Sequence, residues 1–98
     1  MTRQISLLVN DRPIELDYFA QNFIDHTIGG ILAGLEGVGE IKSVTLSIEG
    51  DKVTINLNNA VLSINPFVSK ITRNTTVGMV SSLKGVGEIN KVNISIKR

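Results

Sequence analysis

Apolar and polar residues alternate at the start of the chain, with apolar residues at positions 5, 7 and 9. This period of two predicts a half-buried strand. Asn10-Asp11 follows, and both residue types tolerate the positive φ of a tight turn, so the renewed alternation over residues 14–16 predicts a hairpin. Pro13 has no N–H to donate to a neighbouring strand, which predicts that the return strand lies at a sheet edge.

A helical spacing replaces the alternation after residue 17. Apolar and small residues recur at every fourth position of this segment: Phe19, Phe23, Thr27, Ile31 and Leu35. The pattern predicts a helix over residues 18–35 whose ladder, phenylalanines included, faces the core. Asp17 is a favourable N-cap, and Gly37 lies just past the expected end, where a left-handed residue is favoured. Alternating residues over 44–48 then predict a closing strand.

The second half of the chain repeats this arrangement. Gly37-Val38-Gly39-Glu40-Ile41 recurs 48 residues later, and the same offset aligns residues 5–48 with residues 53–96 without a gap. The match places Phe67 in the core ladder of a second helix beginning at Asn65-Pro66, where the asparagine caps and the proline is tolerated. We therefore predict two copies of one ββαβ unit, neither of which can bury its apolar face alone.

Each predicted strand has one apolar and one polar face. Uncharged side chains form the polar face: Ser6, Thr45, Ser47, Thr54, Asn56, Ser63, Asn93 and Ser95. The apolar face needs a covering layer, which the two helices supply. The prediction is a single domain (1–98) of α+β class. It is a two-layer sandwich with two helices packed on one face of a mainly antiparallel sheet and pseudo-twofold symmetry between repeat one (5–48) and repeat two (53–96). Strand order is left open.

The middles of the two helices, residues 27–35 and 75–83, contain no charged residue. A stripe of small residues runs along them: Thr27, Gly30, Gly34, Thr75, Gly78 and Ser82. Mid-helix glycine costs about 0.5–1 kcal/mol relative to alanine, a cost that a close backbone approach offsets. Two interpretations follow. The helices cross each other at Gly30 and Gly78 within one chain, or the stripe contacts a second subunit.

Charge is distributed unevenly between the halves. The chain has 10 basic and 9 acidic residues and a net charge of +1. Residues 1–49 hold three basic and seven acidic residues, a net charge of −4, and residues 50–98 hold seven basic and two acidic residues, +5. Two equivalent positions have opposite signs, Asp25 against Arg73 and Glu36 against Lys84. Either these side chains lie on solvated faces that diverged, or the acidic half of one molecule faces the basic half of another.

Catalytic and metal-binding groups are scarce in the sequence. There is no cysteine, and His26 is the single histidine, so we expect no catalytic residues, no cofactor and no metal site. Gly37-Val38-Gly39 follows a helix, whereas phosphate-binding loops precede one. Glu40 and Glu88 recur at equivalent positions, which fits either a symmetric carboxylate pair or a hydrogen bond within each loop.

These observations favour a non-enzymatic small binding or scaffold domain that acts through protein–protein contacts and self-association. Its expected partner is itself, as a homodimer, or another protein. An alternative is a nucleic-acid-binding domain that uses the polar sheet face or the basic second repeat, with a candidate basic surface at Lys70, Arg73, Lys84 and Lys91. An enzyme whose site forms between subunits is a third possibility. No targeting or membrane-spanning segment is recognisable, so we expect a cytoplasmic location and no membrane partner.

Overall fold

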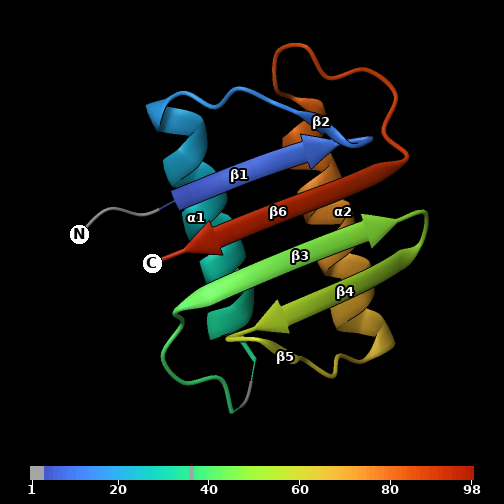
Figure 1. The fold of residues 1–98 in the computed structure, drawn as a ribbon. Coiled ribbons are helices and arrows are strands. Elements are labelled where there is room, and N and C mark those ends of the chain that lie inside the picture. Colours follow the sequence, from blue (N-terminus) through green and yellow to red (C-terminus); the bar gives the residue numbers. More distant parts are fainter. Residues whose placement is uncertain (1–3, 36) are drawn as a thin grey trace.

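The computed structural model describes residues 4–35 and 37–98 (Figure 1). The elements are β1 (Gln4–Val9), β2 (Arg12–Pro13), α1 (Tyr18–Ala33), β3 (Ser43–Glu49), β4 (Lys52–Leu57), β5 (Ala60–Val61), α2 (Pro66–Ser81) and β6 (Lys91–Lys97). Each half of the chain therefore contains the order ββαβ. Glu36, whose charge is opposite to that of Lys84, lies outside the described residues.

The six strands form one antiparallel sheet in the order β2-β1-β6-β3-β4-β5. Both helices lie on the same face of this sheet (Figure 1), which confirms the two-layer α+β prediction. The closing strands β3 and β6 form the centre of the sheet, and Leu46 pairs there with Ile94, the residue 48 positions later. β1 pairs with β6 of the other half, and not with β3, so each half completes the other's sheet.

Two asparagine-containing turns open the hairpins as expected. Asn10 and Asp11 have φ values of 52° and 66°, and Asn58 and Asn59 have 51° and 68°. The return strands are shorter than the alternation predicts, because β2 and β5 pair over only two residues each before the chain turns towards a helix. Pro13 lies in β2 at the outer edge of the sheet, as its missing N–H requires.

The helix caps also match the sequence. Asp17 Oδ1 accepts a hydrogen bond from Ala20 N at 2.7 Å, and Asn65 Oδ1 accepts one from Val68 N at 2.8 Å. The first helix ends at Ala33, two residues earlier than the pattern predicts. Gly37 has a φ of +80°, so the chain reverses in the left-handed conformation that glycine adopts without steric cost.

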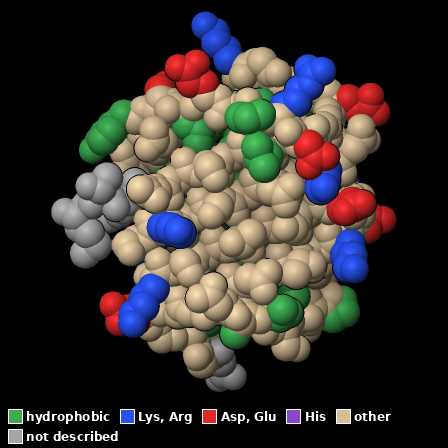
Figure 2. Space-filling view, viewed as in Figure 1, with side chains coloured by type: hydrophobic (Ala, Val, Ile, Leu, Met, Phe, Trp, Pro, Cys, Tyr) green, Lys and Arg blue, Asp and Glu red, His purple; other side chains and the backbone are tan. Residues whose placement is uncertain are grey.

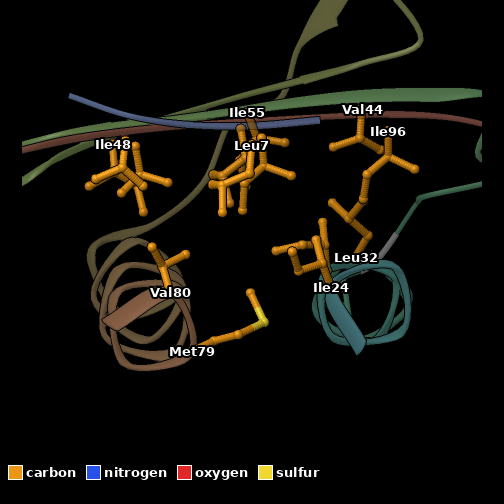
Figure 3. Packing of buried hydrophobic residues seen from close by; sticks show 14 residues of the cluster. Leu7, Ile24, Leu32, Val44, Ile48, Ile55, Met79, Val80 and Ile96 are labelled. Carbon is orange, nitrogen blue, oxygen red and sulfur yellow. The ribbon is translucent and has the colours of Figure 1, made fainter. Parts of the chain in front are cut away.

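The core lies between the sheet and the inner faces of the helices (Figure 3). It is formed by the apolar strand residues and by one stripe on each helix: Leu7, Val9, Ile24, Ile28, Leu32, Val44, Leu46, Ile48, Ile55, Met79, Val80, Val92, Ile94 and Ile96. In the second half, Thr72 and Thr76 occupy the positions that Ile24 and Ile28 hold in the first, and both threonines are buried. Neither threonine hydroxyl has a hydrogen-bond partner in the described part of the chain.

Charged residues of the acidic first half pair with basic residues of the second half within one chain. Asp25 is fully buried and pairs with Arg98, whose Nη2 lies 3.0 Å from Asp25 Oδ1. Lys91 pairs with Asp11 at 3.2 Å, so opposite charges from the two halves meet within one chain at both places. The expectation that Asp25 lies on a solvated face is therefore wrong. Arg98 reaches it from the end of β6, the element that follows both predicted helices in the chain.

Candidate protein-interaction surface

The outer surface of α1 and α2, facing away from the sheet, exposes large apolar side chains. We call it the helix face, and its bulky members are Phe19, Phe23, Phe67 and Ile71. Their exposed fractions are 74%, 49%, 70% and 46%. Phe19 and Phe23 stack on one another with ring centroids 5.9 Å apart. Large exposed apolar patches are typical of surfaces that bind another protein or a ligand, so the helix face is the candidate interaction surface.

The helical spacing of these phenylalanines predicted that they lie in the core, and that prediction is wrong. The stripe that packs on the sheet in α1 is Ala20, Ile24, Ile28 and Leu32. This stripe is displaced by one residue, about 100° around the helix, from the ladder that contains Phe19 and Phe23. Both ladders are apolar at spacings of four, so periodicity shows two candidate faces. The sheet is covered by the stripe with smaller, aliphatic side chains.

An apolar groove of about 590 Å³ lies between the two helices on this face. Phe19, Phe23 and Thr27 line it from α1, and Gly78 and Ser82 are among the residues that line it from α2. Met79 extends from α2 towards α1 beneath it (Figure 3), and its exposed fraction is only 9%. The helices are thus held apart by core side chains, and the outer space between them is unfilled.

Four of the six predicted contact residues line this groove. They are Thr27, Thr75, Gly78 and Ser82. The other two are exposed: Gly30 lies in α1, and Gly34 is the residue that caps its C-terminus. A methyl group added to Gly30 or Gly78 would have no neighbour within 4 Å among the described residues beyond its local helix backbone. The predicted crossing of the two helices at these glycines is therefore wrong, because Met79 and the other core side chains keep the helices apart.

Charged groups contribute little to the helix face. The helices contain three charged residues, Asp25, Lys70 and Arg73, with His26 as a further titratable one. Asp25 is buried, and Arg73 Nε donates to Gly50 O at 2.7 Å and lies 3.5 Å from Asp51 Oδ1. Lys70 and His26 are exposed.

The candidate basic residues do not form one patch. Lys70 lies near the start of α2 and Lys84 beyond its end, which separates them by about 20 Å along the axis. Arg73 and Lys91 each have an acidic partner. The open face of the sheet is covered mainly by uncharged side chains and backbone, with most charges at its rim (Figure 2).

The recurring glutamates contribute their backbone to the loops. Asn58 Nδ2 donates to Glu40 O, and Asn10 Nδ2 donates to Glu88 O, each at 2.8 Å. These are loop hydrogen bonds, but the acceptor is the main-chain carbonyl and not the carboxylate. Across residues 4–35 and 37–98, no three acidic or histidine side chains are grouped so that they could hold a metal ion.

In comparisons with known proteins, no family model, curated protein or solved structure matches the chain. Within the described residues, neither helix has the length and apolar character needed to cross a membrane.

Proposed function

We propose that this chain is a non-enzymatic binding or scaffold domain that acts in the cytoplasm through protein–protein contacts, and that its first partner is a second copy of itself. The observation that carries the proposal is the helix face, where Phe19, Phe23, Phe67 and Ile71 are exposed on a surface with few charges. Interface cores are enriched in aromatic residues and depleted of charged ones.

The apolar area available supports a stable contact. With about 200 Å² for an aromatic side chain, the exposed parts of these four residues amount to roughly 450 Å². A standard interface buries about 800 Å² on each partner. The four side chains therefore supply about half of that area, and the small and polar residues between them are available for the remainder.

Nucleic-acid binding receives less support from the arrangement of charge. Such binding depends on several basic side chains that neutralise neighbouring phosphates. Here Lys70 and Lys84 lie far apart, and Arg73 and Lys91 have acidic partners within the chain.

Sedimentation velocity over a range of concentrations tests the proposal. Wild type should sediment as a dimer at micromolar concentration, and the double variant Phe19→Asp/Phe67→Asp should sediment as a folded monomer. Val61→Asp is the matched control, because Val61 is 73% exposed but lies in β5 at the sheet edge. The control should stay dimeric. A wild type that remains monomeric, or a double variant as dimeric as the control, would refute self-association through this face.

A further inference from the structure

We propose that the dimer is held by the aromatic half of each helix seating on the small-residue half of a partner helix. This inference rests on the proposed self-association and specifies how the two copies meet. It follows from the order of residues along α1 and α2, from the antiparallel arrangement of the helices, and from the symmetry of a two-copy contact.

Both helices change character from one half to the other. Each begins with bulky exposed side chains, Phe19 and Phe23 in α1 and Phe67 and Ile71 in α2. Each continues with small residues on the outside, which are Thr27, Gly30 and Gly34 after the first pair and Thr75, Gly78 and Ser82 after the second. We call the bulky first half of each helix its ridge and the small-residue second half its hollow.

The antiparallel packing places ridge beside hollow within one subunit. Phe19 and Phe23 share the groove with Gly78 and Ser82, so the first half of α1 lies beside the last part of α2. The first half of α2 correspondingly lies beside the second half of α1 (Figure 1). The helix face thus has two ridges at diagonally opposite corners and two hollows at the other corners.

Symmetry then restricts how two such faces can meet. Two copies in a closed dimer are related by a twofold axis, and for face-to-face contact the axis lies in the plane of the helix layer. An axis running along or across the helices places each ridge of one copy over a hollow of the other. An axis along the diagonal places ridge on ridge and hollow on hollow. Packing without voids at core density therefore favours the first arrangement.

The glycines allow the two copies to approach each other closely. Gly30 and Gly78 have open space around the missing side chain, so an aromatic ring from a partner can reach the helix backbone. Exposed mid-helix glycine is otherwise unfavourable compared with alanine. A close approach between copies accounts for its presence twice at equivalent positions.

Filling the hollows tests the seating directly. Gly30→Leu and Gly78→Leu should leave the isolated subunit folded, because a Cβ added at either position meets no atom within 4 Å, but they should raise the dimer Kd about tenfold or more. The matched control is Gly39→Leu. Gly39 is an exposed loop glycine outside the helix face, a Cβ added to it would meet no described atom within 4 Å, and its φ is not left-handed. Its Kd should equal that of wild type, and unchanged Kd values for both helix variants would overturn the inference.

Disulfide trapping separates this inference from the dimer itself, and the chain contains no cysteine of its own. Equimolar Phe23→Cys and Gly78→Cys, or Phe23→Cys and Gly30→Cys, should give a mixed disulfide between subunits. Which of the two mixtures reacts identifies the axis. A dominant Phe23→Cys homodisulfide in a protein that is dimeric by sedimentation would overturn ridge-on-hollow seating while leaving self-association intact. A monomeric wild type would refute the proposed function as well.

Discussion

Asn10 and Asn58 make the same three hydrogen bonds, each to the loop of the opposite half of the chain. Asn10 bonds to Glu88 O and to the backbone N–H groups of Asn90 and Lys91, at 2.8–2.9 Å. Asn58 forms the equivalent set with three backbone groups of residues 40–43, at 2.8–3.0 Å. Both asparagines also have positive φ. One residue type thus forms the hairpin turn and fixes the loop that leads into a central strand.

Replacing Asn10 with alanine should lower the free energy of unfolding by about 2 kcal/mol. Three exposed hydrogen bonds are lost, and alanine is disfavoured at φ 52°. Chemical denaturation with urea measures the change. Asn10→Gly separates the two causes, because glycine accepts the backbone conformation but makes none of the bonds, so it should be about 1 kcal/mol less destabilising than alanine. Equal stability of the alanine variant and wild type would show that the loop is fixed by other contacts.

The second prediction concerns the ion pair between Arg98 and the buried Asp25. Arg98→Ala should destabilise the fold by about 2 kcal/mol, less than for a fully buried pair because the arginine side chain is 30% exposed. Gly29→Ala should give less than the gain of about 0.5–1 kcal/mol that alanine brings to a helix interior, since its methyl carbon would lie 2.9 Å from Arg98 Nη2 and the guanidinium must shift. Thermal denaturation of both variants and of the double variant provides the check. Additive changes in stability would mean that Gly29→Ala acts independently of Arg98.

Removing an unsatisfied hydroxyl should stabilise the protein. Thr72→Val and Thr76→Val keep the side-chain shape and remove a polar atom that has no hydrogen-bond partner in the described chain. Each should add about 1 kcal/mol to the free energy of unfolding. The first half already has isoleucine at both equivalent positions. Thr45→Val on the exposed sheet face serves as the control and should change stability little. A loss of stability in both core variants would show that the hydroxyls are satisfied after all.

Association should depend little on salt. The earlier alternative, in which the acidic half of one molecule meets the basic half of another, predicts dissociation as screening increases. The helix face contributes few charges, and Asp25 and Asp11 have partners within the chain. The dimer Kd should therefore change less than about threefold between about 0.05 and about 0.5 M salt. A steep rise in Kd, measured by sedimentation, would restore the charge-driven interpretation.

Local chemistry in the sequence predicted the local structure well. Asn10-Asp11 requires a turn, Asp17 and Asn65 cap helices, and Gly37 reverses the chain, because each of these effects depends on a few neighbouring atoms. The assignment of apolar faces was harder. Phe19 and Phe23 follow the same spacing as Ile24 and Ile28, so spacing alone does not select the buried ladder, which in the structure is the aliphatic one.

Contacts between residues far apart in the chain could not be predicted from the sequence. Nothing in the alternation of β1 and β6 indicates that they are neighbours, since every strand offers the same backbone groups. The partner of Asp25 was missed for a related reason. Arg98 lies 73 residues away, and a charge inside an apolar helical segment was the one signal that it needed a buried counterion.

The position of β6 also determines when this protein can fold. Among the elements of residues 4–35 and 37–98, β6 comes last, yet it lies between β1 and β3 and pairs with both. During synthesis, β1 and β3 therefore emerge from the ribosome long before the strand that joins them. Until residues 91–97 follow, the growing chain exposes two strand edges and two apolar helices without a finished sheet. The complete sheet can therefore form only after residues 91–97 have been synthesised.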